Sequence, residues 1–295
     1  MTPRLKGIFI ALAGTTVWAT TGIFISYLLK HYTLQPLTLA FWRDLMIATA
    51  LFIILRFAQP QALRISRQDV PFFIGYGFFG LAIFNSLWTL SVKYNGAAVA
   101  TVLAYSSPAF TVLLARLALK ESLTARKLAA VTLSLVGCVL VAKAYSLEVW
   151  RVNFVGILVG LGTGMAFGIY TVAGRWSSKR FANAWTVTAY GFLFAACGLA
   201  LTQRSDTLFT MREGSGWLIL VILAIGPSLA GFGLYTLSMR YLQASMASLI
   251  GSLEPALTAI MAIFILGETL VAWQWLGSGL ILAAILLAQS EEFMK

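Results

Sequence analysis

Charged residues are scarce in this sequence, and their scarcity narrows the class of protein. Only 11% of the 295 residues are Asp, Glu, Lys or Arg, whereas soluble proteins average about 25%. Hydrophobic residues make up 60% of the chain, and the mean hydropathy is +0.87. A water-soluble fold needs more polar surface than this composition supplies. The sequence therefore predicts an all-α integral membrane protein.

Residues that serve metal, redox and acid-base chemistry are also few. The chain has one His and two Cys, and both Cys138 and Cys197 lie inside apolar runs. We interpret them as small core residues and expect neither a disulfide nor a metal cluster. An intramembrane enzyme would need a His or Asp pair, or a Ser with a Lys or His base at membrane depth, and the sequence has no such arrangement. We expect no enzyme activity and no cofactor.

Acidic residues are outnumbered by basic ones, 10 to 21, which gives a formal net charge of +11. The basic residues cluster in short loops rather than along a tail or one helix face, so nucleic acid is not an expected partner. Thirteen lie at the termini and in alternate loops, six lie in the other loops, and Arg43 and Arg116 lie inside apolar runs. Because cytoplasmic loops are enriched in Lys and Arg, both termini are predicted to be cytoplasmic. Membrane lipids and a small-molecule substrate are the expected partners, and we expect a monomer.

The apolar residues gather in ten runs of helix length. They span approximately 7–29, 36–57, 70–92, 97–118, 125–144, 153–174, 184–202, 216–239, 244–266 and 272–288. The first run is too long for a secretory signal peptide, whose apolar region has about 7 to 15 residues. Ten transmembrane helices are therefore predicted, joined by short loops.

The chain contains an internal duplication. Residues 87–123 align without a gap with residues 234–270, a shift of 147 positions. We predict a first five-helix repeat over residues 1–148, a second over residues 149–290, and a polar tail over residues 291–295. Five crossings are an odd number, so the second repeat should enter the membrane from the opposite side. Inverted repeats with a substrate site near the bilayer midplane are a recurring plan of secondary transporters.

Two prolines mark the matched helices of the repeats. Pro108 and Pro255 each lie inside an apolar run, where the missing N–H removes a helical hydrogen bond and should kink the helix. We predict that both act as hinges. Glu254, beside the second proline, lies about 15 Å from the start of its helix and so near the bilayer middle. Two interpretations stay open: it binds a substrate ammonium, or it bonds to backbone that Pro255 frees.

Polar and aromatic side chains on the same helices predict a central cavity. Spacings of i, i+3, i+4 and i+7 place several of them on one helical face. The candidate substrate-binding residues are Trp18, Asn85, Trp88, Thr101, Tyr105, Tyr170, Tyr235, Ser248, Ser252 and Glu254. The alternative is that the aromatic residues mark membrane interfaces or only pack. Arg43 could pair with a neighbour or attract a carboxylate, but we expect its side chain to snorkel towards the outer surface.

Glycines recur every four residues in the sixth apolar run. Gly156, Gly160, Gly164 and Gly168 form a smooth strip along one helical face. Small residues at this spacing let helix backbones approach closely within a membrane. The strip therefore predicts close packing of this helix against a neighbour.

The proline helices carry a resemblance to a known family. Each proline is followed thirteen residues later by Glu, from Pro108 to Glu121 and from Pro255 to Glu268, in a chain of ten short-looped spans. This arrangement resembles the drug/metabolite transporter superfamily over essentially the whole chain. The aromatic-rich sequence is similar to bacterial aromatic amino acid exporters. The resemblance implies an inner-membrane exporter of phenylalanine, tyrosine and tryptophan.

The cavity residues agree with that substrate class. Flat apolar rings suit an aromatic side chain, and polar groups suit the two charged ends of an amino acid. A nucleotide sugar is disfavoured because its pyrophosphate would require several Lys or Arg in the cavity. The alternatives are a multidrug or cation exporter, or a transporter of another metabolite in the same superfamily.

Overall fold

The computed structural model describes residues 2–144, 154–181, 183–204, 206–266 and 271–293, and the regular elements within them are all helical. Six segments are long and apolar enough to span a membrane: Pro3–His31, Pro36–Ala58, Val70–Ser91, Val102–Leu119, Phe154–Arg180 and Gly214–Ser238. Two shorter apolar helices cover Ala184–Ala200 and Ala272–Ala288. The prediction of a multi-pass helical membrane protein is therefore confirmed.

The first expected run is two helices rather than one. Helix α1 (Pro3–Trp18) starts at a proline, and the side chain of Thr2 caps it by accepting a hydrogen bond from the Leu5 amide. Helix α2 (Thr21–His31) follows after a break at residues 19–20. Helix α3 (Pro36–Ala58) also starts at a proline and matches the second expected run. A short 3-10 turn, η1 (Pro60–Leu63), follows α3.

The expected boundary between residues 92 and 97 is wrong. Helix α4 (Val70–Gly75), the π-helical segment η2 (Tyr76–Ala82) and α5 (Ile83–Ala104) follow one another without interruption. Asn95 can remain part of α5 because its buried side chain donates hydrogen bonds to Ser91 Oγ at 3.0 Å and to the Gly156 carbonyl at 2.8 Å. The chain breaks later, at residues 105–106, before α6 (Ser107–Leu119) and α7 (Ala125–Val141).

The remaining helices are α8 (Phe154–Arg180), α9 (Ala184–Ala200), α10 (Gly214–Leu223), the π-helical η4 (Ala224–Ser228), α11 (Leu229–Ser238), α12 (Ala244–Gly251), α13 (Glu254–Leu266) and α14 (Ala272–Phe293). Their bounds agree with the later expected runs, except that the run at 216–239 contains a π-helical segment and the run at 244–266 is interrupted at residues 252–253.

Two irregularities recur at the repeat distance of 147 residues. The π-helical segments η2 and η4 occupy matching positions, and so do the breaks at residues 105–106 and 252–253. π-helical segments inside α-helices are frequent at functional sites. The break at residues 19–20 is not repeated, because the equivalent residues 166–167 lie within α8.

The prolines interrupt their helices instead of kinking them. Pro108 and Pro255 are the second residues of α6 and α13. At this position a proline costs no hydrogen bond, since the first amides of a helix have no intrahelical partner. The expected kinks are therefore full breaks between half-helices.

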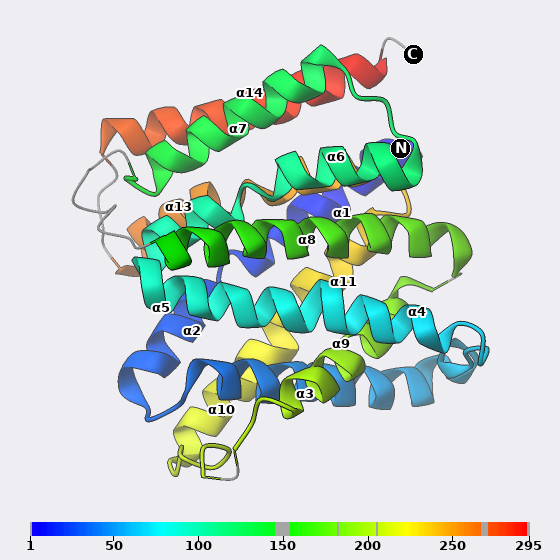
Figure 1. Cartoon of the computed structure of the whole chain (residues 1–295), viewed down its shortest axis with the longest axis vertical. Helices are drawn as coiled ribbons and strands as arrows, with labels where there is room; N and C mark the ends of the chain where they lie inside the picture. The colour runs from blue at the N-terminus through cyan, green and yellow to red at the C-terminus, as the bar shows by residue number, and fades with distance from the viewer. Residues whose placement is uncertain (1, 145–153, 182, 205, 267–270, 294–295) are drawn as a thin grey trace.

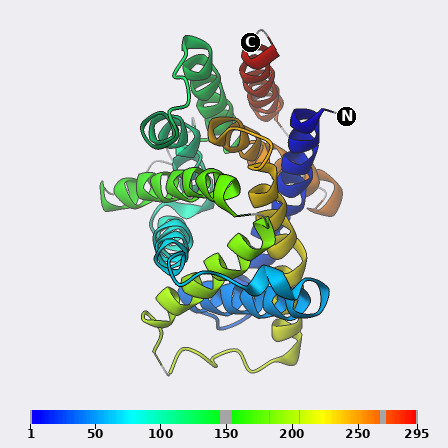
Figure 2. The ribbon, with the colours of Figure 1, turned by 90° about the vertical axis from the view of Figure 1, so that its right-hand side faces the viewer.

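Glycine lets helices approach closely at two places. In α8, a side chain on Gly160 would meet Leu103 at 2.4 Å and one on Gly164 would meet Ser106 at 2.2 Å, so the predicted strip packs against the break between α5 and α6. Helices α7 and α14 lie side by side (Figure 1), where a Cβ on Gly137 would lie 2.7 Å from the Gly277 carbonyl oxygen. The start of α1 and the end of α14 lie near each other in both views (Figures 1 and 2).

Candidate central cavity

The helix breaks meet around a central cavity. Together with the open solvent beside it, this space measures about 680 Å³, and its walls come from α1, α2, α3, α5, α6, α8, α11, α12 and α13, with Tyr105 of the first break. Both halves of the sequence therefore contribute to one space. Small-molecule sites are concave and lined mainly by apolar and aromatic side chains with a few polar groups, and the residues that line this space have that character.

Aromatic rings form a large part of the wall. The Trp18 ring centroid lies 4.3 Å from that of Phe232 and 5.5 Å from that of Phe167, and Phe84 lies 5.2 Å from Phe167. Trp88 lines the same space. Tilted pairs at these distances stabilise one another and fix flat apolar surfaces. The wall can accommodate a ring.

A carboxylate lies at the second break and reaches the first. The Tyr105 hydroxyl donates a hydrogen bond to Glu254 Oε2, which joins the two halves of the chain across the cavity. Glu254 is also in the first turn of α13, where the helix dipole favours a negative charge. Its Oε1 atom has no hydrogen-bond partner among the described residues. The cavity therefore offers a free carboxylate oxygen.

A second polar cluster consists of Arg43, Asp44 and Asn85, whose side chains bond to one another. Arg43 donates from Nε and Nη2 to Asp44 Oδ1, at 3.2 and 3.1 Å. Asn85 accepts from Arg43 Nη2 at 2.7 Å and donates to Asp44 Oδ2 at 2.7 Å, which closes the network. Arg43 is only 4% exposed. The expectation that Arg43 snorkels is therefore wrong: a neighbouring carboxylate and an amide on α5 hold it inside the protein.

The cavity continues towards the α2–α3 connection. A second space shares Arg43, Asn85 and Trp88 with the first and extends to Leu29 and Pro36, near the end of α2 and the start of α3. Thr21, on the wall of the first space, is 5% exposed and its hydroxyl has no partner among the described residues.

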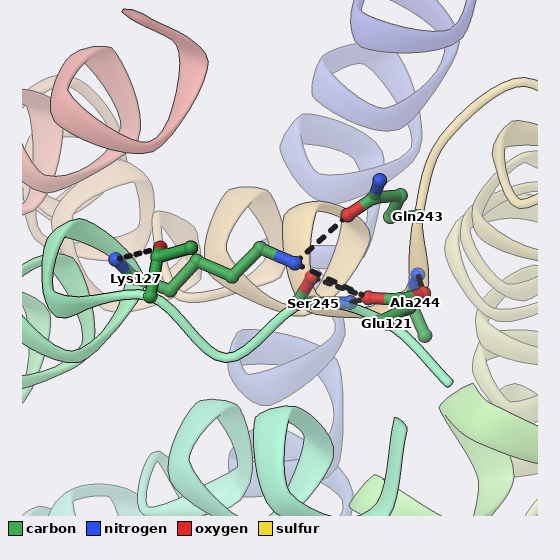
Figure 3. A network of polar contacts seen from close by, with 6 residues as sticks. Glu121, Lys127, Gln243, Ala244 and Ser245 are labelled. Carbon is green, nitrogen blue, oxygen red and sulfur yellow. Dashed lines mark hydrogen bonds and ion pairs between the residues drawn. The ribbon is translucent and has the colours of Figure 1, made fainter. Parts of the chain in front are cut away.

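At the other end, hydrogen bonds and an ion pair join the α6–α7 connection and the start of α7 to the start of α12 (Figure 3). The Glu121 carboxylate caps α12: it accepts from the Ala244 amide at 2.8 Å and from Ser245 Oγ at 2.6 Å. Lys127 lies 3.6 Å from Glu121 and donates to Gln243 Oε1 at 2.9 Å. The α6–α7 connection that carries Glu121 lies at the opposite side of the molecule from the α2–α3 connection (Figure 1). The two halves are joined at this end, about 10 Å along α12 from the cavity.

The structure divides the predicted site residues into two groups. Trp18, Asn85, Trp88, Tyr105 and Glu254 line the cavity. Four others lie behind its wall, where each bonds to a neighbouring helix: Tyr170 with Thr236, Tyr235 with Thr171, Ser248 with Thr111 and Ser252 with Ser134. Their helix faces meet other helices, which helical spacing alone does not reveal. The side chain of Thr101 lies outside the described part of the chain.

Several lining residues were absent from the prediction. Thr21 and Gly22 line the cavity because the chain breaks just before them, and no proline marks that break in the sequence. Phe84 lies among many other phenylalanines without a distinguishing pattern. Arg43 had a usable signal, since an ionisable pair inside an apolar run commonly faces the bundle interior.

The fold and the cavity define a class, a multi-pass membrane transporter built around a central site. More specifically, the chain belongs to the EamA-like transporter family, whose model matches residues 5–143 and 154–289. The resemblance to the drug/metabolite transporter superfamily is thereby confirmed. One matched stretch lies in each half of the chain.

Relatives and a solved structure agree with this family. YicL of Salmonella typhimurium, described as an uncharacterized inner membrane transporter, is 25% identical over 96% of this chain and 94% of its own. YyaM of Bacillus subtilis, an uncharacterized transporter, is 26% identical over 95% and 93%. A transporter from Archaeoglobus fulgidus is 29% identical over 72% and 76%. A crystal structure of a protein with 19% identity superposes with a TM-score of 0.80 over 97% of this chain and 96% of that one, which supports the fold.

Proposed function

We propose that this protein is a secondary transporter that exports small amphipathic metabolites, principally aromatic amino acids, by alternating access to the central cavity. The observation that carries the proposal is the cavity itself: aromatic rings from both halves surround a free carboxylate oxygen of Glu254. Rings accommodate an aromatic side chain, and a carboxylate binds an ammonium group.

The two ends of the cavity support alternating access. One end continues towards Leu29 and Pro36, whereas the Glu121 network holds the other end closed. To move a substrate, a transporter must close the open end of the cavity and open the closed end. In the inverted-repeat plan this happens when the two halves rock against each other around a fixed site. In this proposal the breaks beside Pro108 and Pro255 absorb the bending.

The proposed location is a bacterial inner membrane with both termini in the cytoplasm. The excess of Lys and Arg in the terminal segments and alternate loops supports this orientation. The network around Glu121 would then lie at the cytoplasmic end. Export requires that this end open to load substrate.

A second candidate function is export of cationic aromatic drugs. Glu254 favours it, since a carboxylate in an aromatic cavity binds a cation both directly and through the rings. An enzyme function is less favoured, because the family and the relatives of this chain are described as transporters.

Uptake of labelled tryptophan and alanine into proteoliposomes tests the proposal. We expect the wild type to carry tryptophan, and Trp88→Ala to reduce its uptake about tenfold by removing an anchoring ring. Trp275→Ala is the matched control, because Trp275 is 54% exposed and lies on α14, away from the cavity. An imposed pH gradient tests coupling to protons.

Two outcomes would contradict the proposal. A wild type that carries no tryptophan would remove the aromatic assignment. Equal losses for tryptophan and alanine in Trp88→Ala would mean that this ring only packs the bundle.

A further inference from the structure

The charges around the cavity do not balance. Among the described residues that line it or bond to its lining, Arg43 is the only cation, and Asp44 and Glu254 are the two carboxylates. An uncompensated charge inside a protein is costly, and cavity contents can supply the missing partner. The question is which carboxylate lacks a cation.

Asp44 is the compensated one. Both of its oxygens are bonded, Oδ1 to Arg43 and Oδ2 to Asn85, and Asn85 in turn accepts from Arg43. In this network the positive charge of Arg43 is neutralised by Asp44. A substrate carboxylate that approached Arg43 would also approach the negative charge of Asp44.

Glu254 is the uncompensated one. Its partner among the described residues is the neutral hydroxyl of Tyr105, and none of the ion pairs of the described residues includes it. The start of α13 favours its negative charge but supplies no whole positive charge. Its Oε1 atom remains available for a donor in the cavity.

We infer that the site selects a positively charged amino group held by Glu254, and that a substrate carboxylate is dispensable. The inference rests on the proposed function, in which this cavity is the substrate site. Aromatic monoamines then belong to the substrate class and bind more tightly than the corresponding amino acids. The Trp18 and Trp88 rings add cation–π attraction for the same group.

Three indole ligands distinguish the contribution of the ammonium group from that of the carboxylate. Tryptophan has an ammonium and a carboxylate, tryptamine has only the ammonium, and indole-3-propionate has only the carboxylate. We expect calorimetric titration of the purified protein to rank tryptamine first, tryptophan about tenfold weaker and indole-3-propionate weakest. Tryptophan must also desolvate its carboxylate near the negative charge of Asp44, and indole-3-propionate lacks the ammonium that Glu254 binds.

Glu254→Gln keeps an acceptor for Tyr105 and removes the charge. It should weaken tryptamine about tenfold or more and leave indole-3-propionate unchanged or improved. Asp69→Asn is the matched control: it neutralises another carboxylate, which pairs with the half-exposed Arg180 and does not line the cavity, so the ranking of the three ligands should not change. If Glu254→Gln does not fold, the wild-type ranking still decides.

The outcomes distinguish the inference from the proposed function. Tight binding of tryptophan without binding of tryptamine would overturn the inference and leave aromatic amino acid transport standing. Equal losses for all three ligands in Glu254→Gln would also overturn it, because Glu254 would then support the fold only. Failure of all three ligands to bind would overturn both.

Discussion

The two halves of the chain share a backbone plan but differ in chemistry at matched positions. Each half has a π-helical segment and a helix break at the same place, 147 residues apart. At the break, however, Ser107 in the first half corresponds to Glu254 in the second. Both side chains line the cavity, but only one can carry charge. The backbone irregularities therefore recur at matched positions, whereas the polar groups at those positions differ.

A similar difference in charge distinguishes α3 from α9, the helix that packs against it. Arg43 on α3 belongs to a buried charged network, whereas the hydroxyl of Tyr190 on α9 donates to the Leu63 carbonyl at 2.8 Å and needs no countercharge. The first half thus supplies a neutralised ion pair and the second half supplies the free carboxylate. Variants on these two helices can test this division.

The largest effect is expected where a buried charge loses its partner. Asp44→Asn leaves Arg43 uncompensated and should destabilise the protein by about 3–5 kcal/mol. Tyr190→Phe, on the neighbouring helix α9, loses one neutral hydrogen bond and should cost about 1 kcal/mol. Thermal unfolding in detergent compares them. Arg43→Gln combined with Asp44→Asn should recover much of the loss, and equal melting temperatures for Asp44→Asn and Tyr190→Phe would contradict the ion-pair account.

An intermediate effect is expected at the contact between the halves. Glu121→Gln weakens the cap of α12 and should cost about 1.5–3 kcal/mol, the usual range for hydrogen bonds to a charged group. Asp69→Asn is the control: Asp69 pairs with Arg180, which is half exposed, and such pairs contribute about 0.2–1 kcal/mol.

Hydrogen exchange measures how these two variants change the local stability of α12. Amides at the start of α12 should exchange faster in Glu121→Gln and stay unchanged in Asp69→Asn. Unchanged exchange at Ala244 and Ser245 in Glu121→Gln would show that the carboxylate does not hold this end closed.

The smallest effect on stability is expected at the two prolines. Pro108→Ala and Pro255→Ala add an amide in the first turn of a helix, where no intrahelical partner exists, so unfolding should change by less than about 1 kcal/mol. If the breaks act as hinges, tryptophan transport should slow by more than this change explains. Normal transport rates in a well-folded double variant would remove the hinge role.

Much of the backbone plan could be predicted from the sequence. Composition fixed the membrane class, and a gapless repeat with matched prolines located both of the paired breaks. These features are local: a proline acts on its own helix, and an apolar run reports its own length. The boundary near residue 95 failed because a buried contact of Asn95 with Gly156 keeps a polar stretch helical.

The site was less predictable because side-chain direction depends on which helix faces meet. Trp88 and Tyr235 occupy matched positions, but Trp88 lines the cavity and Tyr235 is fully buried against Thr171. Sequence symmetry predicted equal roles for them. Arg43 shows the same limit: its partner Asn85 lies 42 residues away, and only the packing of α3 against α5 brings them together.

Ligand protection of a cysteine in the cavity tests the central claim, that the two halves build one substrate site. Gly22 suits the purpose because it lines the cavity and an added Cβ there meets nothing within 4 Å. Gly214, at the start of α10, has the same open surroundings away from the cavity and provides the control. Cys197 is exposed and is replaced by Ser in both variants.

The measurement is the rate of maleimide modification of Gly22→Cys and Gly214→Cys in purified protein, with and without saturating tryptophan. The account predicts that tryptophan slows the reaction at position 22 severalfold and leaves position 214 unchanged. Equal rates at position 22 with and without bound tryptophan would contradict it, because the ligand would then occupy a site other than the cavity between the halves.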